Sequence, residues 1–349
     1  SIWRREHPWF QYPNEKEYQL LKDWQLESRK LPVRVFVPYG FAGDYEKKGL
    51  PFDGTFALSV RELSADDWCM TFGLDFINPV AIVIQRAVSS LQEQESDFDI
   101  EDILAKIKND NEAGVDSRQA AMNLFGGART WRIFAGRNQK STATRELIQG
   151  GITSVVDLSC YNSVGTFNVR ALIIGLISRK LFNERMSARK AEEVQAVQQG
   201  IDYTHYKQER EMPLVWIFID EAHEFLPKVG KTAATDTLIQ LLREGRQPGI
   251  SLILATQQPG AIHEDVMTQA DIVIAHRVTS KPDVESLNVI MQTYLIEDIK
   301  SYMNNLPDLK GSCIILDDNS ERIYPCRIRA RFTWHGGEAP TAIKVERRI

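Results

Sequence analysis

Three polar side chains, Asp220, Glu221 and Gln257, directly follow apolar runs of the sequence, and their types suit nucleotide hydrolysis. The acidic pair follows Leu214–Ile219, and Gln257 lies just after Ile250–Ala255. One acid of such a pair holds Mg²⁺ through its water shell, and the next polarises the attacking water. We assign the first role to Asp220 and the second to Glu221. Gln257 would hydrogen-bond the γ-phosphate or the lytic water. Taken alone, the acidic pair also fits an ordinary loop with a helix cap.

The apolar runs predict the elements that position these side chains. An uninterrupted apolar run bounded by polar residues is typical of a strand buried on both faces of a parallel sheet covered by helices. The segment between the two runs has helical spacing, so strand, helix, strand is the expected unit. Ligands of open parallel sheets bind beyond the carboxyl ends of the strands. We therefore expect Asp220, Glu221 and Gln257 at one edge of an α/β sheet.

The helix predicted between these strands, Thr235–Gly245, delivers two arginines to its far end, where a Pro-Gly pair stops it. Arg243 and Arg246 have two possible roles there. Either arginine could pair locally with Glu244 or Asp236, or reach the γ-phosphate of a neighbouring subunit as a trans finger.

A phosphate-binding loop is the clearest absence from the sequence, because neither GxxxxGKS nor GxxxxGKT occurs. The only Gly-Lys-Thr, Gly230–Thr232, has Phe225 where the first glycine of that motif should be. It also follows the acidic strand, whereas the phosphate loop should precede it. We expect the chain to be the carboxyl-terminal part of a longer ATPase. The alternative is that another chain supplies the strand that carries the loop.

Several segments taken together resemble a known family. They are IDEAHEF at 219–225, LLREGRQPGISLILATQQP at 241–259, and ADIVIAHRV at 270–278 followed by Asp283. In order, spacing and identity they resemble the HerA-type hexameric DNA translocases of the FtsK–HerA branch of P-loop ATPases. GITSVVDLSCY at 151–161 resembles the strand that precedes the long helix and the acidic strand in that family. The resemblance runs from about residue 150 to 316, and more weakly from residue 56.

The resemblance implies a RecA-like fold, with a parallel-core sheet flanked by helices, an α-helical insertion, and the central phosphate-loop strand outside this chain. It implies a cytoplasmic homo-hexamer that hydrolyses ATP with Mg²⁺ between subunits and moves along double-stranded DNA. A nuclease of the NurA kind, or another effector as in anti-phage systems, would be the partner. Arg246 matches the finger position of the family, so we assign it first and Arg243 second.

The loop Pro227–Thr232 follows the acidic strand and carries Lys228 and Lys231. In ring translocases, loops at this place often point into the central channel, where lysines meet DNA phosphates. The alternative, which the sequence supports equally well, is that this loop is an exposed linker with no contact to DNA.

Helical spacing predicts helices over Pro79–Gln94, over Ile100–Lys108 with Asp99 as its cap, and over Ser117–Phe134 with a break at its two glycines. We predict a helix at Asn168–Phe182, followed by a solvated helix extension or an excursion from residue 183 to 212. The expected division of the chain is an amino-terminal remainder of the RecA-like domain (1–65), a helical insertion (66–150), the ATPase core (151–335) and a tail (336–349).

Composition sets limits without deciding the function. With 349 residues and 43% hydrophobic content, the chain can bury a real core, and a net charge of −5 argues against a surface coated for non-specific nucleic-acid binding. No run approaches the roughly 18 apolar residues of a membrane span, so no membrane association is expected. The four cysteines show no metal spacing, and we expect buried free thiols. Gly311–Leu316 and Ile323–Ile328 predict a closing hairpin, and Cys313 and Cys326 could face each other on its neighbouring strands.

Three alternatives to a hexameric translocase remain. The tetrapeptide at 220–223 spells DEAH, as in monomeric two-lobed helicases, but only about 90 residues follow Gln257, too few for a second lobe. A ring-forming scaffold that assembles and regulates an effector enzyme would bind ATP with little translocation. A secretion or conjugation motor of the same branch would require membrane association.

Overall fold

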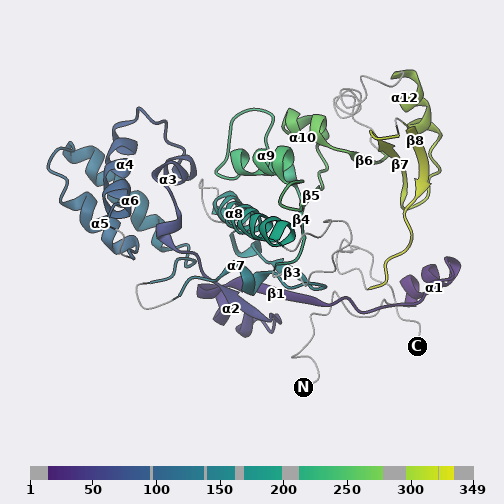
Figure 1. Cartoon of the computed structure of the whole chain (residues 1–349), viewed down its shortest axis with the longest axis horizontal. Coiled ribbons are helices and arrows are strands. Elements are labelled where there is room, and N and C mark those ends of the chain that lie inside the picture. The colour runs from purple at the N-terminus through teal and green to yellow at the C-terminus, as the bar shows by residue number, and fades with distance from the viewer. Residues whose placement is uncertain are drawn as a thin grey trace, which may run out of the picture.

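The computed structural model describes residues 15–94, 97–136, 140–161, 169–198, 212–277, 296–320 and 322–333, and it has an α/β architecture (Figure 1). The strands are β1 (Val33–Pro38), β2 (Gly54–Phe56), β3 (Thr153–Val156), β4 (Val215–Ile219), β5 (Ile250–Leu254), β6 (Ile272–His276), β7 (Ser312–Asp317) and β8 (Arg322–Arg327). The α-helices are α1 (Glu15–Asp23), α2 (Ala42–Lys47), α3 (Ala65–Phe72), α4 (Pro79–Gln92), α5 (Ile100–Lys108), α6 (Val115–Arg129), α7 (Thr144–Leu147), α8 (Val169–Gln198), α9 (Thr235–Glu244), α10 (Glu264–Gln269) and α12 (Ile296–Asn305).

The strands of the described residues form three sheets. β1 pairs in parallel with β2 and β3, β4 pairs in parallel with β5, and β7 pairs antiparallel with β6 and β8. Parallel strands flanked by helices confirm the predicted α/β class. One continuous sheet is not formed within the described residues, because β5 and β6 belong to different sheets, as do β3 and β4.

The prediction that the acidic strand is buried on both faces is wrong for this structure. β4 buries Val215 and Ile219 on the face that α8 and α9 cover. On the other face Trp216 is 64% exposed and Phe218 is 66% exposed. Leu214 and Ile253 are exposed as well. We call these four residues the apolar outer face. The helices of the described residues cover β4 and β5 from one side only.

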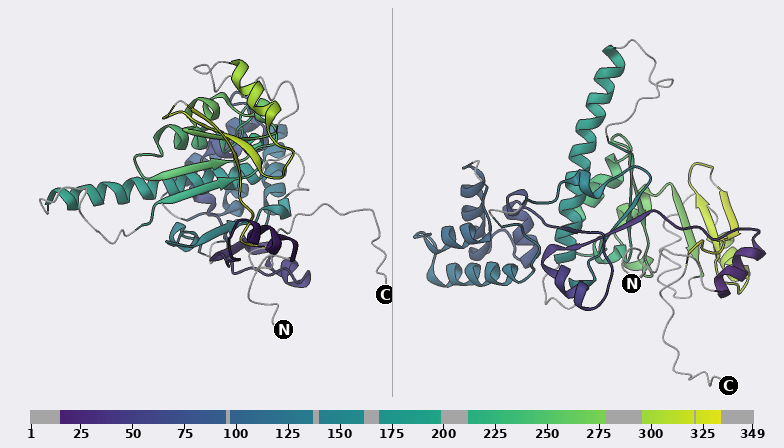
Figure 2. Two further views of the ribbon diagram at one scale, coloured as in Figure 1. Left: turned by 90° about the vertical axis from the view of Figure 1, so that its right-hand side faces the viewer. Right: turned by 90° about the horizontal axis from the view of Figure 1, so that it is seen from below.

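Helix α8 is the longest element of the described chain, with 30 residues. Its first half buries Ala171, Leu172 and Leu176 in the core. Its second half continues to Gln198, so the extension predicted after Phe182 is helical that far, and it projects beyond the body of the molecule (Figure 2). Residues 199–211 of the predicted excursion lie outside the described residues.

Helices α3 to α6 gather at one side of the molecule around an aromatic cluster (Figure 1). Trp68 stacks on Phe72 and lies against Phe125, with ring centroids 5.6 Å and 4.9 Å apart. The predicted cap of α5 is confirmed, since Asp99 accepts hydrogen bonds from two backbone amides of its first turn. The predicted break at Gly126 and Gly127 is wrong, because α6 runs through both glycines.

The predicted closing hairpin is confirmed by β7 and β8. Cys313 and Cys326 are opposite each other in its register, with their Sγ atoms 3.2 Å apart. All four cysteines are free thiols, and burial raises the pKa of Cys313 to about 11, with the hydrogen bond to Cys326 as the next cause. Asp283 and the tail 336–349 lie outside the described residues.

Candidate nucleotide-hydrolysis site

Two strand ends meet where the sequence analysis expected the chemistry. The parallel register aligns Val215 with Ile250 and Ile219 with Leu254, so β4 and β5 end at the same level of the sheet. The backbone bond from the Ala222 amide to the Ala255 carbonyl, 2.9 Å long, continues this pairing past the strands. The structure therefore brings the acidic pair and Gln257 to one edge. Paired parallel strands end side by side, so the residues that directly follow them lie close together.

Glu221 is fixed at this edge by both its backbone and its side chain. Its backbone has φ 48° and ψ 45°, the left-handed conformation that non-glycine residues rarely adopt. The amide Nε2 of Gln257 donates a 2.6 Å hydrogen bond to Oε1 of Glu221. The other oxygen, Oε2, is shielded from solvent and has no hydrogen-bond partner among the described residues. Nδ1 of His223 lies 3.6 Å from Oε2. One carboxylate oxygen is thus restrained by Gln257, while the second is buried and has no hydrogen-bond partner among the described residues.

Asp220 presents an exposed carboxylate beside Glu221. Its Oδ1 accepts a 3.0 Å hydrogen bond from the backbone amide of Glu221. No group of three potential ligands that could hold a metal directly occurs among the described residues. Mg²⁺ usually keeps several waters and takes only one or two carboxylates from the protein. The exposed Asp220 therefore fits Mg²⁺ held through water, and does not fit a cage made by side chains of the described chain.

A second pair joins the same two strand ends, and the sequence analysis missed it. Nδ1 of His223 lies 2.9 Å from Oγ1 of Thr256. His223 is two residues after Glu221, and Thr256 immediately precedes Gln257, so this pair runs beside the Glu221–Gln257 bond. The available signal was a second pair of complementary polar side chains next to the first. Together the two bonds tie the ends of β4 and β5 side chain to side chain.

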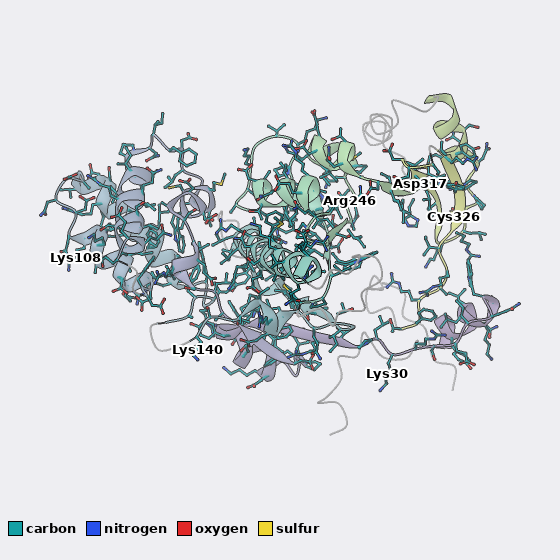
Figure 3. All side chains as sticks on the ribbon, viewed as in Figure 1. Lys30, Lys108, Lys140, Arg246, Asp317 and Cys326 are labelled. Atoms are coloured by element: carbon teal, nitrogen blue, oxygen red, sulfur yellow. The ribbon has the colours of Figure 1, made fainter. Side chains whose placement is uncertain are left out.

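The two candidate arginines have different surroundings. Arg243, on the last turn of α9, forms a 2.8 Å ion pair with Asp265 of α10, and not with the acids that the sequence suggested. Arg246 is exposed, and its guanidinium forms no ion pair with the residues that the structure describes. It lies between α9 and β5 in the central part of the molecule (Figure 3). Of the two, Arg246 has the guanidinium that is available to a partner.

Arg246 and Gln257 lie at opposite ends of β5. Arg246 precedes the first residue of the strand, Ile250, and Gln257 follows its last residue, Leu254. At a rise of about 3.3 Å per residue, the five-residue strand alone separates the two ends by roughly 15 Å. Arg246 therefore does not belong to the cluster formed by Glu221 and Gln257 of its own chain.

The lysine loop projects from a fixed base. Its base is held by backbone bonds of 2.8 Å from the Lys228 amide to Ala261 and from the His263 amide to Leu226. At its tip Val229 is 88% exposed. Lys228 is exposed, whereas Lys231 is engaged in a 2.8 Å ion pair with Asp236. The loop thus presents one uncommitted and one committed ammonium group.

Comparison with known proteins finds similarity to curated helicases over part of the chain. The DNA double-strand break repair helicase HerA of Pyrococcus furiosus is 24% identical over 161 residues, 42% of this chain and 28% of that protein. The probable DNA double-strand break repair helicase HerA of Methanocaldococcus jannaschii is 30% identical over 121 residues, 32% of this chain and 24% of that protein. The chain spans less than a third of the length of these relatives. No protein-family model matches it.

Among solved structures, VirB4 of Thermoanaerobacter pseudethanolicus is similar with a TM-score of 0.49 at 10% identity, over 95% of this chain and 92% of that chain. The sequence matches support a relationship to the HerA–FtsK superfamily of ATPases. Within the described residues, no helix has the length and apolar character needed to cross a membrane.

Proposed function

We propose that this relative of the HerA–FtsK ATPases is the motor part of an ATP-driven DNA translocase or helicase that works as a hexameric ring. The observation that carries the proposal is the hydrogen bond between Gln257 and Glu221 at the paired ends of β4 and β5. A carboxylate with one oxygen restrained and one unpaired is suited to accept a proton from an attacking water.

Each residue at the strand ends then has its own role. Glu221 would orient and polarise the water, while Gln257 holds the carboxylate and would hydrogen-bond the γ-phosphate or the water. Asp220 would hold Mg²⁺ through water, and the bound ion would offset the charge that develops on the phosphate oxygens. His223 and Thr256 keep the two strand ends together, so that the acid and the amide stay aligned.

The phosphate loop must come from outside this sequence, from an upstream segment of the same product or from another chain. Two features support this part of the proposal. Within the described residues, β5 pairs only with β4 and β6 only with β7, so each leaves one edge for a further strand. The apolar outer face, with Trp216 and Phe218, is a surface that a covering segment would remove from water.

The position of Arg246 supports sites that are shared between subunits. Because it lies at the end of β5 remote from Glu221, its guanidinium would serve a neighbouring subunit as a trans finger. Arg243 is the second candidate, but its ion pair with Asp265 engages it locally. A ring in which each nucleotide lies between two subunits makes Arg246 a necessary part of every site.

The DNA contact and the partner complete the proposal. Lys228, the exposed residue between the fixed base and the tip of the loop, would meet duplex phosphates in the channel of the ring. The effector would be a nuclease of the NurA kind or another enzyme that the ring serves.

The deciding experiment measures ATP hydrolysis by the complete gene product with and without duplex DNA, with the mass of the assembly in solution checked in parallel. The wild type should be stimulated by DNA, and Glu221→Gln and Arg246→Ala should both be inactive. If DNA has no effect and Arg246→Ala hydrolyses normally, the motor is rejected and a ring-forming scaffold takes its place. A scaffold would keep its effector active in the Glu221→Gln variant.

A further inference from the structure

A buried arginine in the middle of α8 has no role in the site described above. Arg185 is 1% exposed. Its Nε donates a 2.8 Å hydrogen bond to the carbonyl of Pro248. Its Nη1 donates to the carbonyl of Met212 at 2.9 Å and to Oε1 of Glu192 at 3.2 Å. A charge this deeply buried is costly unless it is paired and hydrogen-bonded, so the acceptors around it are arranged for a guanidinium.

The acceptors of Arg185 belong to the segments that lead into both strands of the site. Met212 lies three residues before β4 begins, and Pro248 lies two residues before β5 begins. Pro248 is also two residues after Arg246. One side chain of α8 therefore joins the amino ends of β4 and β5 to the loop that carries the proposed finger.

The rest of that loop is short and tightly turned. The Ile250 amide donates to the Gly245 carbonyl at 2.8 Å, and the Gly249 amide donates to the Arg246 carbonyl at 3.2 Å. Gly249 has φ +78°, and a Cβ placed there would lie 3.7 Å from Nη2 of Arg185. The guanidinium thus packs against the loop as well as bonding to it.

We propose that Arg185 is a positioning residue that fixes the loop Gly245–Gly249 and thereby sets the direction in which Arg246 leaves the subunit. This inference rests on the proposed trans role of Arg246. The guanidinium is a planar fork whose donors point in fixed directions, so it sets the directions of the two carbonyls and the carboxylate, whereas the ammonium of a lysine is a point charge with rotatable donors. Misplacement of a transition-state contact by about 1 Å lowers a rate by about a hundredfold.

The same helix offers a matched control. Arg179 donates to both oxygens of Asp67, at 3.1 Å and 2.8 Å, and to the carbonyl of Glu62 at 3.0 Å. It is therefore an α8 arginine with carboxylate and carbonyl partners, like Arg185, but its partners lie in the segment around α3. Arg179→Met removes a comparable set of bonds without touching the finger loop.

The test uses the complete gene product and the double variant Arg185→Met with Glu192→Met, which removes the buried pair without leaving an unpaired charge. Backbone amides of residues 245–250 should exchange hydrogen at least tenfold faster in the double variant and at the wild-type rate in Arg179→Met. The ATPase rate of the double variant should fall tenfold to a hundredfold. Mixing it with Glu221→Gln subunits, which carry an intact Arg246, should restore part of the rate.

Unchanged exchange over residues 245–250 overturns the proposal, as does a loss of rate that Glu221→Gln subunits do not relieve. A third outcome is faster hydrogen exchange of the loop in the double variant together with a fully active Arg246→Ala variant. This outcome distinguishes the positioning role of Arg185 from the finger role of Arg246. In that case Arg185 positions the loop, and the assignment of Arg246 as a finger is wrong.

Discussion

The amide of Gln257 lies 2.6 Å from Oε1 of Glu221, across the gap between two neighbouring strand ends. This bond engages one carboxylate oxygen and leaves Oε2 without a hydrogen-bond partner among the described residues. Glu221 also has a left-handed backbone, which costs about 1–3 kcal/mol at a non-glycine residue. The surrounding structure therefore holds both the backbone and the carboxylate of Glu221 in place. Such restraint is expected for a side chain that would act on a water molecule.

Glu221→Gln should lower the ATPase rate of the complete gene product by about 10²- to 10⁴-fold, the range that a general base contributes. The matched control is Glu224→Gln, because Glu224 lies three residues later and pairs with Arg170 instead. Steady-state hydrolysis at saturating ATP is the measurement. A Glu221→Gln enzyme that retains a tenth of the wild-type rate would remove Glu221 from the chemistry.

Arg246→Ala should abolish hydrolysis alone and regain part of the activity when mixed with Glu221→Gln subunits, because one of the two kinds of mixed interface then combines an intact acid with an intact arginine. Arg243→Ala should instead lose only its exposed ion pair with Asp265, worth about 0.2–1 kcal/mol of stability. The rate as a function of mixing ratio is the measurement. A linear dependence, without a maximum at intermediate ratios, would show that the arginine acts within its own subunit.

Lys228→Ala should weaken duplex binding and lower the slope of log affinity against log salt by about 0.9 for each phosphate that the variant no longer neutralises. Lys231→Ala should have a smaller effect, because that ammonium group is already paired with Asp236. Fluorescence anisotropy of a labelled duplex at several salt concentrations measures both. Equal slopes for the wild type and Lys228→Ala would make the loop an ordinary exposed linker.

Gly249→Ala should destabilise the protein by about 1–2 kcal/mol, because φ is +78° and the added Cβ would lie 2.4 Å from Cδ2 of Leu214. Gly43→Ala is the opposite control, since it lies in α2 with nothing within 4 Å of the added atom, and Gly costs about 0.5–1 kcal/mol relative to Ala in a helix. Urea unfolding of both variants gives the comparison. Equal free energies of unfolding would show that the loop does not require its left-handed residue.

Alkaline pH should destabilise the fold. Burial raises the pKa of Cys69 from 9.0 to about 11, that of Cys160 from 9.0 to about 12, and that of Tyr45 from 10.0 to about 12. Below about pH 8 these groups are protonated in both the folded and the unfolded state, so their contribution to the free energy of unfolding is constant. Above that pH the unfolded chain loses its protons first, and the free energy of unfolding falls until the pH passes the folded values. Urea titrations from about pH 7 to 11 measure the fall, which Cys69→Ala with Cys160→Ala should reduce.

The position of Glu221 and Gln257 at one sheet edge could be predicted from the sequence, because it depends on the strands that directly precede these residues. Apolar runs define β4 and β5, and parallel pairing then brings Glu221 and Gln257 together. The hairpin that aligns Cys313 with Cys326 follows in the same way from two short runs around a turn. Each of these inferences needs only neighbouring residues and the regular geometry of strands.

The features that sequence reasoning missed depend on distant residues. Whether the second face of β4 is buried is decided by what packs on Trp216, and nothing within the strand itself encodes that. Arg185 stands in a charged stretch of α8 that reads as solvated, yet Pro248, 63 positions along the chain, accepts its hydrogen bond. Helical spacing predicts which residues share a face of the helix, but it does not predict which distant backbone carbonyl will accept their hydrogen bonds.

The exposed indole of Trp216 provides an intrinsic fluorescence signal for binding at the apolar outer face. An indole in water emits at longer wavelength and is quenched by acrylamide, whereas a covered one emits further to the blue and is protected. Docking of a strand or helix onto the apolar outer face would therefore change the fluorescence of this one tryptophan. The difference between the wild type and Trp216→Phe isolates its signal from the other six. Assembly of the complete protein thus becomes visible in real time without an attached dye.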